Sequence, residues 1–574
     1  MLPPHWPVRF ALAAATAIAP IAVAAQGLTP VSPSEQCHGE VITQIVMHGT
    51  RRTVPAHPER FAEAINGALS TLQPLTPAHV VRDFVLLRAG DKCDEAKRED
   101  SERILRSQPY IGAVAIRAVP VGQDSVRLDV ETIDEYAIFA EAWGLSGVPV
   151  GGEVGTTNLF GGARAVSVTG EIGRGSAFGG GVKFTDYQAF HQPLVLFLQD
   201  ASRPLESYAT ASLARPFLTD FQPYAWLVDA AQSRSYFTFH ETSIRDVSLD
   251  YDERGWAIGG LRRWPHEGRG FQLGAVVAGS YSNPIATAAI RDDGPVPDSA
   301  PAILARYHPF SALRAGLAVG YRNMRYIQVS GLDDLSAVQD VEIGWQSTAM
   351  LLQGIGVFPN TPPDHVGVLN LDFGVGSQFA QLRGGFDVEL RAADSSITPL
   401  AAVGSAHATA TFKTSLGHTT MFDVEVAAGA NTRLPMQLTF RDDDGLLGYR
   451  ATDFGGGRRT IFRFEDRWMI PSPYSGAELA IAPLFQAGKL YAGDALYALT
   501  TPWHYAAGVA IMGAIPRGSK HMVRLEFGWP LNPTGSSQME FRISYGDRSA
   551  SFAQTPTVIV NAREADAAAR AVTP

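Results

Sequence analysis

Apolar and polar residues alternate along most of the chain from about residue 144 onward. In residues 422–426, for example, Asp423 and Glu425 separate three bulky apolar residues. The same alternation occurs in residues 369–375, 523–529 and 541–545. Because successive side chains of a strand point to opposite faces, each segment is predicted to be a strand with one apolar and one polar face.

The pattern before residue 137 is different and mixes helical with alternating spacing. The predicted elements, in chain order, are a strand over residues 40–49, helices over 58–72, from 76 onward and over 95–107, and strands over 110–118 and 125–132. The stretch 55–74 is interpreted as an insertion, which leaves the order strand, helix, helix, strand, strand. A small α+β domain is therefore predicted, followed by a long all-β region.

The first 25 residues have the pattern of an export signal. Arg9 precedes an apolar run over residues 10–25, and small residues stand before Gln26. We predict a signal peptide over 1–25 and a flexible lead over 26–36. The alternative is an uncleaved membrane anchor, for which the apolar run is short, since a spanning helix needs about 20 residues.

Composition narrows the class of protein. The 574 residues carry a net charge of -10, with 18% charged residues, 10% aromatic residues and 56 glycines. This balance argues against a nucleic-acid binder, which would show a basic patch. An exported chain with many alternating strands is either a soluble β-protein or a membrane barrel. Aromatic residues near the ends of predicted strands, such as Trp503, Trp529 and Tyr545, favour the barrel.

A glycine-rich segment over residues 444–459 precedes two alternating strands, over 460–468 and 479–488. It contains Leu446-Leu447-Gly448-Tyr449. This arrangement resembles the sixth extracellular loop and adjoining strands of the BamA/TamA outer-membrane assembly-factor superfamily, whose loop motif is (V/I)-R-G-(F/Y). The glycine and the aromatic residue match that motif, whereas Leu447 stands at the arginine position.

The partner of that arginine is also replaced. In the superfamily it pairs with the aspartate of an F-x-D-x-G or F-(x)-D-A-G pattern, where this chain has Phe485, Gln486 and Gly488. Both charges are therefore absent together. Because an enclosed charge without a partner costs about 3–5 kcal/mol, the double replacement avoids that penalty and supports the alignment.

Three charged residues complete the candidate site. Arg450 follows the motif directly and is a candidate substitute for the missing arginine, although its side chain should point elsewhere. Glu465 and Arg467 match an E-x-R pair of the superfamily and are expected to point into the lumen. Two interpretations stay open for that pair: solvated lumenal polarity, or anchors that hold the loop inside the barrel.

The resemblance implies one POTRA domain followed by a transmembrane antiparallel β-barrel of 16 strands. The assigned parts are the POTRA domain over 37–138, a linker over 139–156, the barrel over 157–552 and a C-terminal tail over 553–574. The POTRA pattern is matched by Gly49, Gly90-Asp91, Tyr110 and Val114. The alternative for this region is a generic α+β domain.

Two short features mark the expected limits of the barrel. Asn158 and Gly161 lie in a turn that is similar to the superfamily's entry into the first barrel strand. Phe552 is expected to end the last strand, as the terminal aromatic residue does in outer-membrane barrels, where it serves as an assembly signal. The tail that follows departs from that pattern and is predicted to be disordered or helical.

The chain contains two cysteines, Cys37 and Cys93. In an oxidising compartment a disulfide between them is the natural interpretation. It would tie the entry of the first strand to the start of a helix and contribute up to about 4 kcal/mol. Two separated cysteines without clustered histidines make a weak metal site, and no cofactor or metal is predicted.

The function that the resemblance implies is insertion of outer-membrane proteins, or translocation of a client polypeptide across that membrane. The alternative is a passive or selective channel with a docking POTRA domain. No catalytic motif is found, so an enzyme is not predicted. The implied partners are outer-membrane lipid, an unfolded client bound at the POTRA strand edge, and periplasmic or lipoprotein accessory subunits. The implied location is the bacterial outer membrane, with the POTRA domain in the periplasm.

Overall fold

The structure is a computed structural model of the chain. It describes residue 28 and residues 31–572, apart from the segments 53–74, 146–147, 173–177, 204, 241–246, 267, 292–293, 298–299, 359–362, 394–399, 416, 442–443, 450–453, 473–475, 535–536 and 548–554. Among the described residues, no helix is long and apolar enough to cross a membrane.

The N-terminal domain is a three-stranded sheet with helices on one side. Its elements are the 3-10 helix η1 (Pro33–Glu35), β1 (Val41–Arg51), α2 (Ala78–Arg82), α3 (Glu95–Arg106), β2 (Ile111–Gly122) and β3 (Ser125–Asp134). The sheet order is β1-β3-β2, with β1 parallel and β2 antiparallel to β3. The core between helices and sheet includes Leu87, Leu105 and Leu128. The predicted order of elements agrees with this domain, but the helix expected over 58–72 lies outside the described residues.

Disulfide formation between Cys37 and Cys93 is confirmed, with a Cα–Cα distance of 5.0 Å. The bridge joins the segment before β1 to the segment before α3, and both cysteines are buried. Next to it, the backbone of Ile42 exchanges hydrogen bonds with residues 90 and 91. The segment before α3 is therefore fixed along the outer edge of β1.

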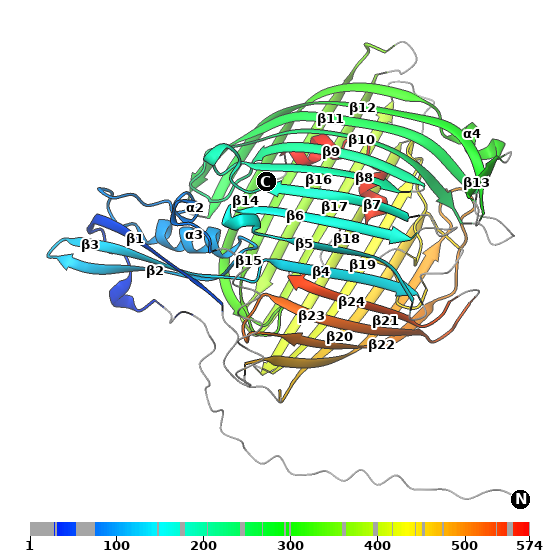
Figure 1. Cartoon of the computed structure of the whole chain (residues 1–574). Helices are drawn as coiled ribbons and strands as arrows, with labels where there is room; N and C mark the ends of the chain where they lie inside the picture. Colours follow the sequence, from blue (N-terminus) through cyan, green and yellow to red (C-terminus); the bar gives the residue numbers. More distant parts are fainter. Residues whose placement is uncertain are drawn as a thin grey trace, which may run out of the picture.

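The remaining strands close into one antiparallel barrel (Figure 1). They are β4 (Ile138–Leu145), β5 (Val148–Thr156), β6 (Arg164–Ile172), β7 (Phe178–Asp186), β8 (Val195–Arg203), β9 (Glu206–Arg215), β10 (Tyr224–Phe239), β11 (Val247–His266), β12 (Arg269–Arg291), β14 (Phe310–Ser330), β15 (Val338–Ile355), β16 (Asp364–Gly376), β17 (Ala380–Ala393), β18 (Ala401–Ser415), β19 (His418–Ala430), β20 (Arg458–Ile470), β21 (Glu478–Tyr491), β22 (His504–Ala514), β23 (His521–Pro530) and β24 (Glu540–Asp547). The short β13 (Gly294–Pro297) pairs with the end of β12. Between β12 and β14 lies the short helix α4 (Pro301–Arg306).

The described barrel has 20 strands, so the prediction of 16 strands is wrong. That prediction divided about 400 residues by a uniform strand-plus-turn length. The strands β4 to β9 are only 8–10 residues long and follow one another through short turns, whereas β11 and β12 have 20 and 23 residues. Strand length therefore varies too much along the chain for the number of strands to follow from the length of the β-region.

Two boundaries also need correction. Residues 139–156, predicted to be a linker, form most of β4 and all of β5, so the barrel begins at Ile138 rather than at residue 157. The prediction placed the first barrel strand after the turn that contains Asn158 and Gly161, but the residues before that turn already lie in paired strands. Asn158 and Gly161, predicted to mark the barrel entry, lie in the turn between β5 and β6, which contains the 3-10 helix η2 (Leu159–Gly161).

The turn between β5 and β6 contacts the N-terminal domain. The Asn158 side chain donates to Thr76 Oγ1 at 2.9 Å and accepts from the Ala163 N–H at 3.0 Å. Gly161 has φ +73°, and an added Cβ would lie 2.8 Å from the Leu75 carbonyl oxygen. Only glycine fits this position, because both the backbone conformation and the close approach exclude a side chain.

Side chains of the barrel alternate between an outer and an inner face. Leu351 is 67% exposed, whereas the next residue, Leu352, is fully buried. The alternating segments that the sequence predicted lie in β16, β19, β23 and β24, with residues such as Phe422 and Trp529 outside and Asp423 inside. The barrel therefore presents an apolar outer surface, as the alternation predicted.

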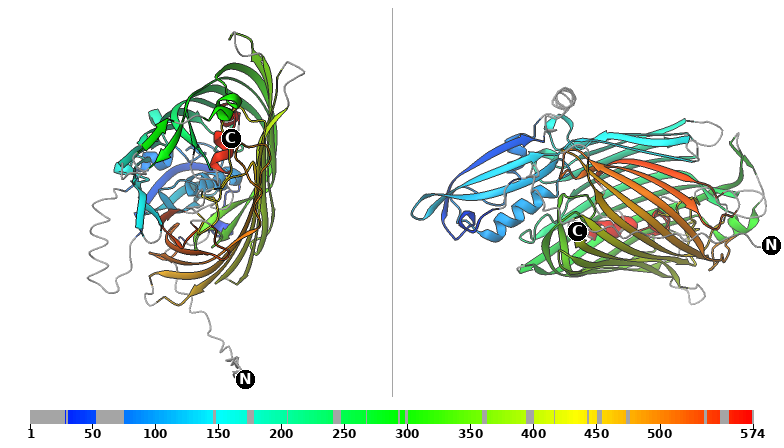
Figure 2. Two further views of the ribbon diagram at one scale, coloured as in Figure 1. Left: turned by 90° about the vertical axis from the view of Figure 1, so that its right-hand side faces the viewer. Right: turned by 90° about the horizontal axis from the view of Figure 1, so that it is seen from below.

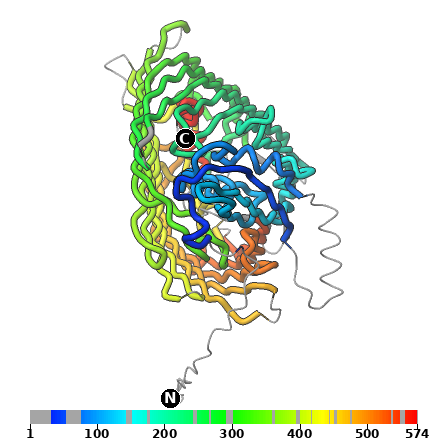
Figure 3. Tube along the Cα trace, turned by 90° about the vertical axis from the view of Figure 1, so that its left-hand side faces the viewer, coloured from blue at the N-terminus to red at the C-terminus, as the bar shows by residue number. Residues whose placement is uncertain are grey.

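The interior of the barrel is filled by three segments. These are the loop between β19 and β20 (residues 431–457), the turn between β14 and β15 (residues 331–337), and the helices α5 (Thr557–Asn561) and α6 (Asp566–Val572) at the C-terminus. Viewed from either end, the red C-terminal helices lie within the ring of strands (Figures 2 and 3). Phe552, expected to end the last strand, lies outside the described residues.

Candidate functional site

The loop over residues 431–457 folds into the lumen and packs there. Its buried apolar residues are Leu434, Met436, Leu438, Phe440, Leu446, Leu447 and Tyr449. Most of them belong to one core cluster with inner residues of β20, β21 and β22, including Ile461, Leu484 and Ala510. Leu438 and Gly456 exchange two backbone hydrogen bonds of 2.8 Å, which close the base of the loop. The loop is therefore part of the folded core.

The motif Leu447-Gly448-Tyr449 is held by hydrogen bonds to the strands β21, β22 and β24. The Leu447 N–H donates to Gln486 Oε1 of β21 at 2.9 Å. The Gly448 N–H donates to Glu540 Oε2 of β24 at 3.0 Å. The Tyr449 hydroxyl donates to the Tyr505 carbonyl at 3.0 Å. The predicted pair of positions, Leu447 and Gln486, thus meets through a neutral hydrogen bond from the Leu447 backbone.

Close packing around glycines fixes the same motif. Gly448 has φ +82°, and an added Cβ would lie 2.6 Å from Pro530 Cδ. At Gly488 of β21 an added Cβ would lie 2.8 Å from side-chain atoms of Leu446 and Phe440. Phe485, by contrast, is 43% exposed and lies on the outer face. The glycines of the motif and of β21 therefore allow the loop to lie directly on the strands.

Charges from β19 and β20 hold the loop from the other side. Arg459 is fully buried and pairs with Glu425 at 2.7 Å and with Asp444 of the loop. Its Nη1 also donates to the Thr439 carbonyl at 2.8 Å. Arg463 pairs with Asp423 at 2.8 Å and with Glu425 at 3.0 Å. Two arginines and their carboxylates thus connect the loop to the barrel wall.

Sequence reasoning did not single out Arg459 as an anchor. A usable signal was present, because Asp423 and Glu425 lie on the polar face of one predicted strand and Arg463 on that of the next, and Arg459 stands directly before that strand in phase with Arg463. Adjacent antiparallel strands place such faces side by side. Recognising the pairing requires the register, in which Asp423 lies opposite Arg463.

Glu465 and Arg467 are buried in the lumen, but their described contacts are with other parts of the barrel and not with the loop over residues 431–457. Arg467 pairs with Glu465 at 3.0 Å and donates to the carbonyls of Leu332 and Asp334 at 3.2 and 3.0 Å. Glu465 also pairs with Arg524 of β23 at 2.8 Å. These residues therefore hold the turn 331–337 inside the barrel. Arg450 lies outside the described residues.

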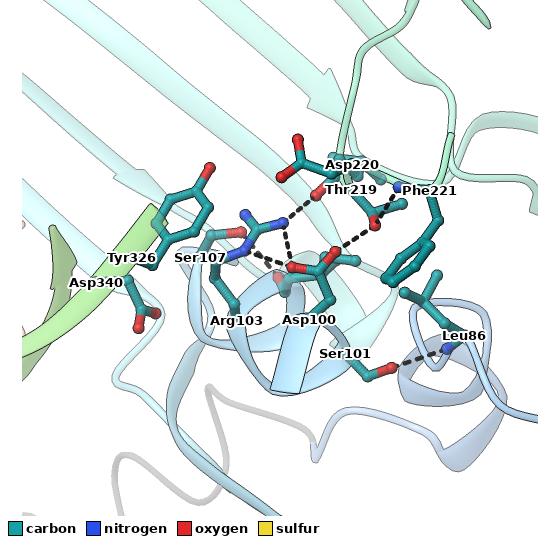
Figure 4. Close-up of polar contacts among 12 residues, drawn as sticks. Leu86, Asp100, Ser101, Arg103, Ser107, Thr219, Asp220, Phe221, Tyr326 and Asp340 are labelled. Carbon is teal, nitrogen blue, oxygen red and sulfur yellow. Dashed lines mark hydrogen bonds and ion pairs between the residues drawn. The ribbon is translucent and has the colours of Figure 1, made fainter. Parts of the chain in front are cut away.

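The N-terminal domain lies across one mouth of the barrel (Figure 3). Helix α3 contacts the rim through Asp100, which accepts from the Thr219 hydroxyl, and through Arg103, which donates to the Leu218 carbonyl at 2.7 Å (Figure 4). The Arg103 guanidinium also lies 4.2 Å from the centre of the Tyr326 ring. One helix of the domain is thus fixed to two parts of the rim.

A second set of contacts ties the domain to the turn between β22 and β23. Glu135, fully buried, accepts from the Ser519 hydroxyl at 2.9 Å and from the Lys520 N–H at 3.1 Å. The Lys520 ammonium donates to the Ile111 carbonyl of β2 at 2.8 Å. Together with the α3 contacts, these bonds fix the orientation of the domain over the mouth.

An open cavity of about 1770 Å³ lies between the domain and the rim. On the domain side it is lined by α3 and by the start of β2, including Arg98, Glu102 and Ala113. On the barrel side it is lined by the ends of β12, β14, β15 and β16. The groove between α3 and β2 therefore faces the mouth of the barrel.

The outer edge of β2 is partly covered by two side chains of α3. The Ile116 N–H donates to Glu102 Oε1 at 2.7 Å, and Arg98 Nη1 donates to the Ile116 carbonyl at 3.0 Å. Burial raises the pKa of the Glu102 carboxyl, and the neighbouring Arg98 opposes that shift. Side chains here occupy backbone groups that an added strand would otherwise bind.

The first and last strands close the barrel over a short register. β24 pairs with β4 over six residue pairs, from Glu540 opposite Leu145 to Tyr545 opposite Ala140. β5 and β6 also pair over six residue pairs, whereas β14 and β15 pair over 18. Because Glu540 also accepts from the Gly448 N–H, the lumenal loop is bonded to this junction. The junction and the loop motif thus form one connected site.

No group of three or more histidine, cysteine, aspartate or glutamate side chains suited to a metal ion occurs in the part of the chain that the structure describes.

Comparisons with known proteins give matches only among solved structures. No family model and no curated protein matches the chain. A BamA from Haemophilus ducreyi lacking POTRA domains 1–3 is 10% identical, with a TM-score of 0.38, over 87% of this chain and 84% of that one. CdiB from Acinetobacter baumannii is 10% identical, with a TM-score of 0.39, over 88% and 74%. CdiB from Escherichia coli is 11% identical, with a TM-score of 0.41, over 91% and 94%.

The chain is thus similar to these structures over most of its length, at low identity and with loose superposition. What is established is the class: a closed antiparallel β-barrel that carries an N-terminal α+β domain. The functional assignment rests on the contacts within this chain.

Proposed function

We propose that the chain is an outer-membrane barrel that receives an unfolded polypeptide at the mouth covered by its N-terminal domain, and inserts it into the membrane or moves it across. The N-terminal domain acts as a POTRA domain in the periplasm. The observation that carries the proposal is the 1770 Å³ cavity in which the edge of β2 faces the barrel mouth.

The outer surface of the barrel supports a membrane location. Large apolar side chains such as Leu317, Leu351 and Phe422 are 63, 67 and 49% exposed on the outer face. A closed barrel leaves no unpaired strand edge, so its backbone can lie in lipid without water as a partner. The inner face holds the buried ion pairs described above. This distribution is typical of barrels that span a membrane.

The groove between α3 and β2 supports client binding by strand addition. An extended polypeptide adds to a sheet through main-chain hydrogen bonds to a free edge. β2 is an edge strand of the sheet, and its start lines the cavity. The Arg98 and Glu102 side chains at Ile116 would have to move aside, which lets them act as a reversible cover of the edge.

The short junction between β4 and β24 supports a barrel that opens sideways. Six residue pairs close it, and the loop motif contacts its last strand at Glu540. Separation of these strands would expose two edges in the plane of the membrane, to which a client strand could add. The lumen, filled by loop, turn and tail, favours this role over a passive channel.

The test is site-specific photocrosslinking at the edge of β2. A photoreactive amino acid at Ala113, which lines the cavity, should capture an unfolded outer-membrane barrel polypeptide translated in vitro in the presence of reconstituted protein. The matched control is Val121 on the same strand, which is 52% exposed and does not line the cavity. Equal capture at both positions, or none at Ala113, would contradict the proposal.

A further inference from the structure

The C-terminal segment over residues 555–572 lies inside the barrel and packs against its wall. α6 contacts β10, β11, β12 and β15, and α5 contacts β18 and β19. The wall beneath α6 is apolar, unlike the charged lumenal face of β19 and β20. It is formed by Ala257, Leu261, Val276, Ala278, Ala318, Met350, Leu352, Val366 and Val368, which are all buried.

Small residues of α6 match this wall. Ala568 and Val572 are buried, and Ala571 lies so close to β11 that a Cβ added at Gly259 would be 2.8 Å from its Cβ. A larger side chain at Gly259 would therefore displace the helix. An apolar lumenal wall would be unfavourable in a water-filled bore, so its presence indicates that it is normally covered.

A carboxylate ahead of the helix is held by three arginines. Glu564 is buried and lies 2.6 Å from Arg314 of β14, 3.1 Å from Arg391 of β17 and 3.4 Å from Arg433 of the lumenal loop. The space left beside it is about 10 Å³, at the lower limit of what one water molecule needs. Arg314 and Arg433 also pair with Asp364 of β16, at 2.6 and 3.5 Å, so the arginines hold one carboxylate of the wall and one of the C-terminal segment.

Two carboxylates of the barrel wall fix the two ends of the segment. Glu389 of β17 accepts from the N–H groups of Glu564 and Ala565 at 2.9 and 3.0 Å. At the other end, Arg570 pairs with Asp229 of β10 at 2.9 Å. The wall thus recognises the segment by its charge order, acidic before the helix and basic near its end, as well as by its small side chains.

We propose that this wall is a lumenal binding site for a short alanine-rich helix preceded by a carboxylate, and that the chain's own C-terminal segment is its resident ligand. The segment is a plug that closes the bore and leaves when a client passes. The role in transport rests on the function proposed above, whereas closure to ions does not.

Conductance in planar lipid bilayers tests the plug. The full chain should be mostly closed, and a chain that stops after residue 554 should show a large steady conductance. Glu564→Gln removes the charge held by the three arginines and should raise the open probability about tenfold or more, because loss of a buried ion pair shifts an equilibrium by at least that factor. The matched control is Glu153→Gln, an inner carboxylate of β5 that pairs with Lys183 and should leave conductance unchanged.

A covalent link between the segment and the wall should have the opposite effect to truncation. Asp229→Cys with Arg570→Cys, joined by a photocleavable thiol reagent about as long as the lost arginine side chain, should keep the barrel closed until illumination. If the truncated chain and Glu564→Gln both insert yet remain as closed as the full chain, the plug is overturned. Opening by truncation without capture at Ala113 would leave the plug standing and refute the client function alone.

Discussion

Single residues of the lumenal loop connect it to the barrel wall without a charge. Leu447 and Gln486, which were predicted to face each other, meet through a backbone N–H and a side-chain carbonyl, 2.9 Å apart. A neutral hydrogen bond of this kind contributes about 1 kcal/mol and leaves no charge to be desolvated. A charged contact is made instead by Arg459, which is fully buried and binds the loop through Asp444.

Gly448→Ala should displace the loop motif from its position on the barrel wall. The left-handed backbone conformation costs a non-glycine residue about 1–2 kcal/mol, and the new Cβ would lie 2.6 Å from Pro530 Cδ. We expect the unfolding midpoint in urea to fall and the loop to become sensitive to added protease. Gly367→Ala is the matched control, since an added Cβ there meets nothing within 4 Å. If the two variants behave alike, the motif does not fix the loop.

Among the elements, β3 of the N-terminal domain carries a group that makes the domain sensitive to pH. Burial raises the pKa of Asp134 from 3.8 to about 6, and hydrogen bonds from Thr76 oppose the shift. Its Oδ1 has no hydrogen-bond partner among the described residues. Between these two pKa values the folded domain binds more protons than the unfolded chain, so its stability falls as pH rises from about 4 to about 6.

Asp134→Asn should remove this dependence. At pH 7 the ionised carboxylate costs the folded domain about 3 kcal/mol at most, so the variant should be more stable than the parent there and about equal to it at pH 4. Hydrogen–deuterium exchange of β1 to β3 in the full chain measures this, with variant and parent compared at each pH. A variant less stable than its parent at pH 7 would show that the charge is favourable.

In the molecule as a whole, the loop 431–457, the turn 331–337 and the C-terminal helices fill the lumen, and the N-terminal domain covers one mouth of the barrel. The N-terminal domain is fixed to the rim by α3 and by Glu135, and the loop motif is bonded to β24 through Glu540. On the barrel side the cavity is lined mainly by the ends of β12, β14, β15 and β16, and none of its lining residues belongs to β4 or β24. A client would therefore have to cross the mouth to reach the junction, and the proposed insertion requires the junction to open there.

Locking the junction should block insertion. Ala142→Cys with Ile543→Cys places two cysteines opposite each other across β4 and β24. Oxidation of this pair should strongly slow assembly of a client barrel in proteoliposomes, and reduction should restore it. The control pair is Leu369→Cys with Val388→Cys, opposite each other within the wall between β16 and β17. Equal rates for both locked proteins would exclude opening at the junction.

The local pattern of the chain was sufficient for the elements and their faces. Alternation with a period of two placed Phe422 outside and Asp423 inside, and the order of elements before residue 137 agrees with β1, α2, α3, β2 and β3. Both features depend on neighbours in sequence, since side-chain direction in a strand is set by the backbone alone. The cysteine pair was also predictable, because the chain offers one pairing.

The number of strands, the anchors of the loop and the position of the tail depended on contacts between residues far apart in sequence. Twenty strands rather than sixteen follow from where each strand turns and pairs, which no local pattern reports. The sequence predicts only a disordered or helical tail for the last residues, but Glu564 lies among Arg314, Arg391 and Arg433, which are brought together only when the barrel closes. Register and closure place such partners, and they exist only in the folded chain.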